Sequence, residues 1–291
     1  MLAPRHLVLT DLDGTLLDHH TYSWAAAAEA LGELEHRGIP WVIVTSKTRA
    51  EVEVLREKMG HGHPFITENG GGIYVPSGYF PIHVKGSERV GRYQCVRLGK
   101  PYTEVVEALD DAAAEAGVSV VGFHSMTPRE IAQNTGLSQG EAEHARLREY
   151  DEPFFFAGAS DAQIARFVGV VKKRGFEARR GGRFWHLVGG CDKGRAVRML
   201  LKFYREALRA GFRTIGLGDS ANDLAMLAAV NQPVLLPQPD VEFSSEVLEC
   251  LPRVVRGAFP GPKGWNVAVL EFIGSRRGAR KVMAESSKRF R

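Results

Sequence analysis

Leu7-Val8-Leu9-Thr10-Asp11-Leu12-Asp13-Gly14-Thr15 is the stretch that decides the fold. Its apolar start is typical of a parallel strand, because helices cover both faces of such a sheet and the strand loses its polar alternation. Ligands of open α/β sheets lie beyond the carboxyl ends of the strands. Asp and Gly are also common in ordinary turns. Two neighbouring carboxylates raise each other's cost of ionisation, however, and a bound Mg²⁺ ion would remove that cost.

The segments on both sides of this motif alternate between buried strands and amphipathic helices. The apolar runs predict strands at 41–44, 65–75, 214–218 and 233–236, the stretch 65–75 containing a glycine turn. Helical spacing of apolar residues predicts helices at 22–37, 49–59, 193–209, 222–229 and 265–273. This alternation indicates an α/β fold with a doubly wound parallel sheet.

The segment between the two halves of this pattern has a different character. Residues 83–189 lack strands that are buried runs; we predict helices at 102–116 and 161–174 and strands at 118–123, 154–157 and 183–188. They predict an inserted α+β domain with an antiparallel sheet and helices on one face. We therefore expect a core made of residues 1–82 and 190–291, with residues 83–189 as a domain inserted into it.

Charge, apolar content and cysteine count limit the classes of protein to which this chain can belong. The 291 residues carry a formal charge of +4 and no apolar run of the roughly 20 residues that a membrane span needs. Without a signal-peptide pattern, the sequence predicts a cytoplasmic protein, and its three scattered cysteines, Cys95, Cys191 and Cys250, read as reduced thiols. The segment from Ser275 onward contains seven basic residues and one glutamate. We expect a frayed basic terminus there and no nucleic-acid or membrane partner.

Three further places follow predicted strands or open predicted helices. Thr45 and Ser46 offer hydroxyl and N–H groups that suit a phosphate, although both are also common helix N-caps. Lys193 opens a helix, where the positive helix end disfavours a lysine unless it has another task; alone, it would read as a surface residue. Asp219 and Asp223 follow a buried strand and suit Mg²⁺, although either could cap the next helix. His61 and His63 have metal-like spacing without a third ligand, so we expect them on a loop surface.

Taken in order, these motifs resemble those of the haloacid dehalogenase-like phosphohydrolases, without a departure. The resemblance implies that Asp11 is the nucleophile and Asp13 the general acid/base. It implies that Thr45 and Lys193 hold the phosphoryl oxygens. It also implies an Mg²⁺ site made of Asp11, Asp13 through its backbone carbonyl, Asp219 and Asp223, where Asp223 either binds the ion or orients one of its water ligands. The resemblance further implies that the inserted residues 83–189 form a cap that closes over the site.

Five weaker stretches resemble the mannosyl-3-phosphoglycerate phosphatase family and span most of the chain. They are residues 45–48, 68–71, 148–154, 181–187 and 261–266. This resemblance implies hydrolysis of mannosyl-3-phosphoglycerate to mannosylglycerate, a compatible solute, and leaves acceptance of the glucosyl analogue open. It adds core candidates for substrate or phosphate contacts: Ser46, Lys47, Glu68, Asn69 and Asn222. The cap candidates are Arg97, Ser125, Thr127, Arg148, Tyr150 and Arg166.

Other functions remain open at this stage. A sugar phosphomutase of the same superfamily would use the same aspartates. A sucrose-phosphatase or a general sugar phosphatase would differ only in its substrate contacts. A noncatalytic sugar-phosphate-binding module is disfavoured, because such modules usually lose an acid and all four are present here. The sequence predicts a small phosphorylated sugar substrate, but no oligomeric state.

Overall fold

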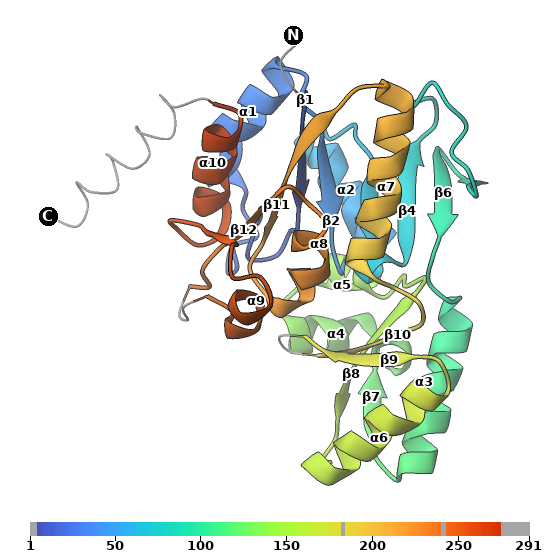
Figure 1. Ribbon diagram of the computed structural model, residues 1–291. Coiled ribbons are helices and arrows are strands. Elements are labelled where there is room, and N and C mark those ends of the chain that lie inside the picture. The colour runs from blue at the N-terminus through green and yellow to red at the C-terminus, as the bar shows by residue number, and fades with distance from the viewer. Residues whose placement is uncertain (1–4, 182–183, 240–242, 275–291) are drawn as a thin grey trace, which may run out of the picture.

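The strand that leads to Asp11 lies near the middle of the larger of two sheets (Figure 1). The structure, a computed structural model, describes residues 5–181, 184–239 and 243–274. Within these residues the larger sheet has nine strands in the order β13-β12-β11-β1-β2-β3-β4-β6-β5. In chain order they are β1 (Arg5–Thr10), β2 (Trp41–Val44), β3 (Phe65–Thr67), β4 (Gly72–Pro76), β5 (Glu88–Val90), β6 (Tyr93–Arg97), β11 (Phe212–Gly218), β12 (Gln232–Leu235) and β13 (Val255–Arg256).

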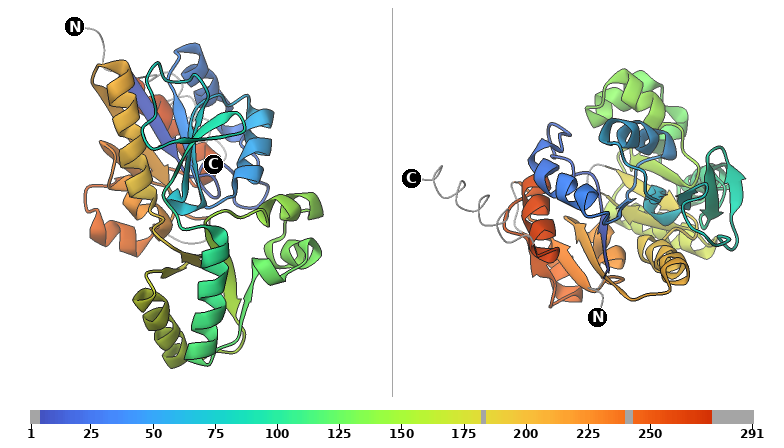
Figure 2. Two further views of the ribbon diagram at one scale, coloured as in Figure 1. Left: turned by 90° about the vertical axis from the view of Figure 1, so that its right-hand side faces the viewer. Right: turned by 90° about the horizontal axis from the view of Figure 1, so that it is seen from above.

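The strands from β13 to β3 pair in parallel, whereas β4, β6 and β5 add an antiparallel edge. Helices cover both faces, as Figure 2 shows from above. Val8 packs into the cluster under α1, α2 and α10, while Leu7 and Leu9 point to the other face, under α7, α8 and α9. The predicted doubly wound α/β core is confirmed. Its helices are α1 (Ala28–His36), α2 (Arg49–Met59), α7 (Lys193–Leu208), α8 (Leu224–Leu227), α9 (Ser245–Cys250) and α10 (Gly261–Phe272).

The smaller sheet is antiparallel, with the order β7-β8-β10-β9. Its helices α3 and α6 pack on one face, where Phe154 and Leu187 lie in their apolar cluster. The prediction of helices on one face is incomplete, because α4 and α5 pack against Val121 and Phe155 of the opposite face. These elements are α3 (Tyr102–Ala116), β7 (Val120–Gly122), α4 (Pro128–Thr135), α5 (Gln139–Ala145), β8 (Asp151–Phe156), α6 (Asp161–Lys173), β9 (Glu177–Arg180) and β10 (Trp185–Val188).

The strand pairing shows that the part of the chain with the smaller sheet starts later than residue 83. Strands β5 and β6 lie inside the predicted cap, yet β6 pairs with β4 and β5 pairs with β6, so both strands extend the core sheet. The polar, exposed residues Glu88 and Arg89 of β5 do not have the buried pattern of the other core strands, whereas β6 buries Tyr93, Cys95 and Val96. We keep the division into core and cap as a proposal, with the first crossing near residue 98.

Two local predictions are wrong. The first helix does not begin at residue 22, because the Asp18 carboxylate accepts the N–H groups of His20 and Thr21 in a turn and Tyr22 has a φ of 54°. Helical structure starts with a 3-10 turn, Ala25–Ala27. His61 is not on a loop surface; it is buried between Arg56 and the carbonyl of Trp41.

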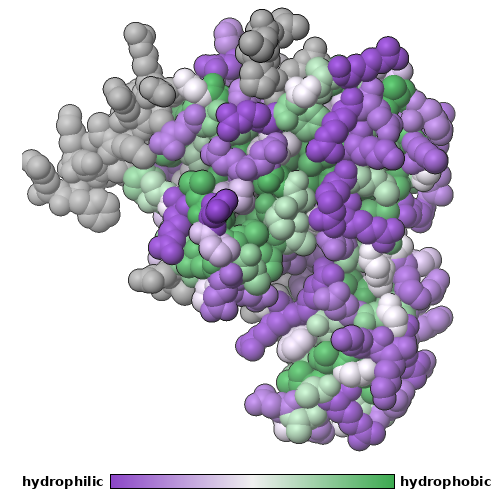
Figure 3. All heavy atoms as spheres, viewed as in Figure 1, coloured by the Kyte–Doolittle hydropathy of each residue, from purple (hydrophilic) through white to green (hydrophobic). Residues whose placement is uncertain are grey.

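Hydrophilic side chains are spread over both units on the face drawn in Figure 3. Among the described residues, no helix has the length and apolar character to cross a bilayer. All three cysteines are free thiols, two of them buried. The basic segment from Ser275 and the pair Gly182-Arg183 lie outside the described residues.

Candidate active site

The parallel register brings the predicted motifs to one edge of the sheet. Thr10, which precedes Asp11, lies beside Leu217 of β11 and Ile43 of β2. The N–H of Asp11 donates to the carbonyl of Leu217 at 3.0 Å, so Asp11 leaves β1 next to the point where β11 ends. Because all three strands run the same way, the residues that follow them share the carboxyl edge.

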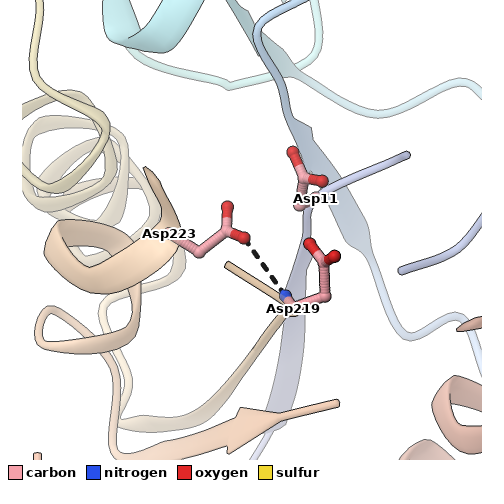
Figure 4. Close-up of side chains that lie close together, drawn as sticks. All are labelled: Asp11, Asp219 and Asp223. Atoms are coloured by element: carbon pink, nitrogen blue, oxygen red, sulfur yellow. Dashed lines mark hydrogen bonds between the residues drawn. The ribbon is translucent and has the colours of Figure 1, made fainter. Parts of the chain in front are cut away.

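Three carboxylates converge at this edge. Single oxygens of Asp11, Asp219 and Asp223 all lie within 4.8 Å of one another, and Figure 4 shows the side chains gathered from two strand ends and the turn before α8. The Lys193 Nζ donates to Asp11 Oδ1 at 2.9 Å and to Asp223 Oδ1 at 2.8 Å. One buried lysine facing three carboxylates leaves negative charge uncompensated.

Burial makes that excess charge expensive. Desolvation and the neighbouring aspartates hold the pKa of Asp11 well above its ordinary value, against the pull of Lys193. Desolvation and then Asp223 raise the pKa of Asp219 to about 7. A divalent cation would lower both pKa values and keep the carboxylates ionised. Clustered carboxylate oxygens are the donors that hard divalent cations prefer, so these residues fit a metal ion.

Glycines allow the loops to approach so closely. At Gly14, with a φ of 73°, a Cβ atom would lie 2.7 Å from Asp219 Oδ2. At Gly70, with a φ of 94°, a Cβ atom would lie 2.4 Å from the Asp192 carbonyl oxygen and 2.8 Å from the Lys193 nitrogen. Gly70 therefore lets the start of α7 reach the β3–β4 turn, and this contact carries Lys193 into the site.

Asp13 lies apart from the three-carboxylate cluster. Its Oδ2 is 3.1 Å from Lys47 Nζ, and that lysine also pairs with Glu51 at 3.6 Å. Its Oδ1 is buried, with no hydrogen-bond partner in the described part of the chain. Lys47 thus holds the carboxylate that the sequence assigns to proton transfer. A metal contact through the backbone carbonyl of Asp13 stays a prediction.

Thr45 and Ser46 are not the cap of the helix that follows them. Thr48 is the N-cap of α2, in a capping box with Glu51. Thr45 is buried, and its Oγ1 accepts the N–H of Lys47 at 3.2 Å. The Ser46 carbonyl accepts a hydrogen bond from Arg148 Nη2. The helix therefore does not use these two hydroxyls as its cap, and their phosphate role stays a prediction.

The structure argues against Glu68 as a substrate ligand. Its carboxylate is fully buried and accepts the backbone N–H groups of residues 149–151 at 2.7–3.0 Å. The buried Asn69 amide donates to Asp151 Oδ2 at 2.6 Å, and Asn222 Nδ2 donates to Asn69 Oδ1 at 2.9 Å. These three side chains connect protein segments to one another. The local sequence has no signal for this, since the partners are far apart in the chain.

The six cap candidates also have partners within the protein, and one of them, Arg97, is not in the cap but on β6 of the larger sheet. Arg97 pairs with Glu88, Ser125 donates to the Gly122 carbonyl, Thr127 caps α4, Arg166 donates to the Glu115 carbonyl, and Tyr150 is buried with its hydroxyl near Cys95. Arg148 pairs with Asp151 and Glu68. Sequence reasoning missed Gln238, whose Nε2 donates to Asp219 Oδ2 at 3.3 Å, and also missed Asp151 and His186.

Known proteins are similar to this chain in sequence. The haloacid dehalogenase-like hydrolase family matches residues 8–83. The glucosyl-3-phosphoglycerate/mannosyl-3-phosphoglycerate phosphatase of Methanococcoides burtonii is 40% identical over 270 residues, 93% of this chain and 98% of its own length. The mannosyl-3-phosphoglycerate phosphatase of Pyrococcus furiosus is 35% identical over 233 residues, covering 79% of this chain and 90% of its own.

Solved structures share the fold at lower identity. A Thermoplasma acidophilum protein superposes with a TM-score of 0.64 at 16% identity, and the two chains are covered to 92% and 98%. The sucrose-phosphatase of Synechocystis, solved with sucrose and phosphate, gives a TM-score of 0.57 at 16% identity. That match covers 92% of this chain and 98% of the sucrose-phosphatase chain. The fold, the motifs at one sheet edge and the close relatives agree: the chain belongs to the haloacid dehalogenase-like hydrolases, in the family that includes these sugar-phosphoglycerate phosphatases.

Proposed function

We propose that this chain hydrolyses the phosphate monoester of mannosyl-3-phosphoglycerate, releasing mannosylglycerate and inorganic phosphate, and that it also accepts the glucosyl analogue. The observation that carries the reaction class is the pairing of Lys193 with Asp11 and Asp223 in a cluster of three carboxylates. The substrate is proposed from the two relatives, because their names include it. In the cell, the reaction would complete the synthesis of a compatible solute in the cytoplasm.

Asp11 is the proposed nucleophile. Its carboxylate oxygen attacks phosphorus in line with the ester oxygen, so that an aspartyl-phosphate forms as the P–O bond to the leaving group breaks. Lys193 binds Asp11 Oδ1 at 2.9 Å and would neutralise the phosphoryl oxygens that meet it there. The Thr45 hydroxyl, at the end of β2, would hold a second phosphoryl oxygen.

Asp13 is the proposed general acid and base. It gives its proton to the leaving alkoxide, and then takes a proton from the water that attacks the aspartyl-phosphate, which regenerates Asp11 and releases phosphate. Its side chain is 39% exposed, so the substrate and water can reach it, and Lys47 fixes its orientation.

Mg²⁺ is the proposed cofactor. Asp11, Asp219, Asp223 and the backbone carbonyl of Asp13 would hold it. When bound, it supplies positive charge that keeps Asp11 ionised and screens the phosphoryl oxygens. Gln238 and the backbone N–H groups that bind Asp223 keep Asp219 and Asp223 in place for this task.

A substrate panel tests the proposal. Phosphate release should be fastest, by kcat/KM, with mannosyl- and glucosyl-3-phosphoglycerate, and slower with sucrose-6-phosphate and simple hexose phosphates. Preference for a hexose phosphate would indicate a general sugar phosphatase. Isomerisation of a hexose phosphate without phosphate release would indicate a phosphomutase instead.

A further inference from the structure

A segment in the middle of the cap is docked on the core. The chain enters the cap near residue 98 and leaves it near residue 190, yet residues 144–151 also bind core loops. The Thr48 hydroxyl donates to the carbonyl of His144 at 2.9 Å, and Arg148 Nη2 donates to the carbonyl of Ser46 at 3.1 Å. Glu68 accepts the N–H groups at the end of the segment. These contacts connect the cap to the same loop that carries Thr45.

Asp151 ends this docked segment, and its carboxylate is fully buried among polar partners. Asn69 donates to Oδ2 at 2.6 Å, His186 Nδ1 lies 2.9 Å from Oδ1, and Arg148 Nη2 lies 3.3 Å from Oδ2. His186 belongs to β10 of the cap, and Asn69 to the core. A single buried carboxylate therefore joins a strand of the cap to the turn between β3 and β4.

The chain of hydrogen bonds continues to the catalytic loop. Asn69 is buried with a φ of 57°, and its Oδ1 accepts the amide of Asn222 at 2.9 Å. Asn222 directly precedes Asp223, whose Oδ2 accepts the N–H groups of Asp219 and Ser220 at 3.2 and 3.3 Å. These bonds tie the turn 219–223 together, so a shift of Asn222 would move both Asp219 and Asp223.

We infer that Asp151, Asn69 and Asn222 are positioning residues that let the docked cap fix the turn 219–223 against Asp11. Among the described residues, Asp151 and Asn69 lie outside the carboxylate cluster, and their side-chain hydrogen bonds continue toward it through Asn222. The inference rests on the proposed phosphatase activity, but not on the identity of the sugar. It predicts that breaking this series of hydrogen bonds weakens divalent-cation binding even without substrate. The reason is that hydrogen-bond partners outside a metal site orient the residues that bind the metal.

Calorimetric titration of Mg²⁺ into the full-length, metal-free protein tests this first. Asp151→Asn and Asn69→Ala should each weaken Mg²⁺ binding by about tenfold or more. Asp111→Asn and Asn134→Ala are matched controls: the Asp111 carboxylate is in an exposed ion pair with Arg174, and Asn134 is exposed on α4. Both controls should bind Mg²⁺ like the wild type. Asn222→Ala, at a half-exposed position, keeps the test informative if a buried variant does not fold.

Kinetics with p-nitrophenyl phosphate separate positioning from mere support of the fold. At saturating Mg²⁺, Asp151→Asn should lower kcat by about tenfold with little change in KM. The effects of Asp151→Asn and Asn222→Ala should be non-additive, and this coupling should vanish in the Asn69→Ala background. Wild-type Mg²⁺ affinity in folded Asp151→Asn, or additive effects, would overturn the inference. A wild type that binds Mg²⁺ but hydrolyses no sugar-phosphoglycerate would refute only the proposed substrate.

Discussion

Lys193 and Asp11 are separated by 182 positions in the sequence, yet Lys193 Nζ lies 2.9 Å from Asp11 Oδ1. The lysine side chain is 1% exposed, and it also bonds to Asp223. Lys193 is thus the only basic side chain bonded to the cluster within the described ranges, and it connects Asp11, which follows β1, to the turn after β11.

Lys193→Met should therefore reduce both activity and stability. Removing one partner of a buried pair leaves unpaired carboxylates, which costs about 3–5 kcal/mol in the free energy of unfolding of the metal-free protein. Loss of the proposed donor to the phosphoryl oxygens should lower kcat at least about 100-fold. Lys202→Met, on the same helix but exposed, is the control and should change the unfolding free energy by less than about 0.5 kcal/mol. Urea unfolding and phosphate release measure the two effects, and an unchanged kcat would refute the role of Lys193.

Gly70→Ala should displace Lys193. The added Cβ would meet the Asp192 carbonyl oxygen at 2.4 Å, in addition to the strain of a positive φ. Gly78→Ala isolates that strain, because Gly78 has a φ of 78° and open space around it. The control should lose only about 1–2 kcal/mol of stability and no activity, whereas Gly70→Ala should lose more stability and most of kcat. Equal losses in the two variants would show that the contact with α7 is unimportant.

His61 should make the protein sensitive to acid. Burial and the Arg56 guanidinium, whose Nε donates to the ring, lower the pKa of His61 to about 3, against the hydrogen bond to the Trp41 carbonyl, which favours the protonated ring. Because the pKa of His61 is lowered in the folded state, the contribution of His61 to the free energy of unfolding is complete above pH 6.5. This contribution is lost as the pH falls from there toward 3, by up to about 1.4 kcal/mol per pH unit.

Unfolding free energies measured between pH 7 and pH 4 test this assignment. His61→Gln should show a shallower pH dependence than the wild type, although it is less stable at pH 7. The exposed His36 is the matched control, and His36→Gln should follow the wild-type curve. Parallel curves for His61→Gln and the wild type would contradict the assignment of a neutral, buried ring.

Mg²⁺ should stabilise the fold through the three carboxylates. When the free concentration of a ligand is about 100 times its Kd, and the ligand binds only the folded state, it adds about 2.7 kcal/mol to the free energy of unfolding. Addition of a chelator should remove this gain together with turnover, and Mg²⁺ should restore both. Asp223→Asn should lose most of the thermal shift that Mg²⁺ causes. The same shift in that variant would place the ion elsewhere.

The sequence predicted most of what depends on local patterns. Buried runs such as Trp41 to Val44 identified the core strands, and the order of the acidic motifs located Asp11, Asp219 and Asp223 at one edge. Strand β5 escaped prediction because its residues Glu88 and Arg89 are polar and exposed. Strand β6 has buried residues, but Gln94 and Arg97 leave it no apolar run longer than two residues. The helices α4 and α5 carry capping boxes at Thr127 and Ser138 that could have identified them.

The role of Glu68 could not be predicted, for a different reason. The groups that donate hydrogen bonds to its carboxylate are backbone N–H groups 81 to 83 positions away in the sequence. Backbone groups carry no residue-specific signal, so a pattern of side chains does not show such a contact. The same holds for Asn69, whose partners Asp151 and Asn222 come from two distant segments.

Rapid-quench mass spectrometry of the enzyme during turnover of mannosyl-3-phosphoglycerate tests the central claim most directly. We predict a transient phosphoryl group on the peptide that contains Asp11, absent in Asp11→Asn, which should also release no phosphate while retaining the wild-type fold. Phosphate release by Asp11→Asn at the wild-type rate, or a phosphoryl group on another residue, would contradict the account.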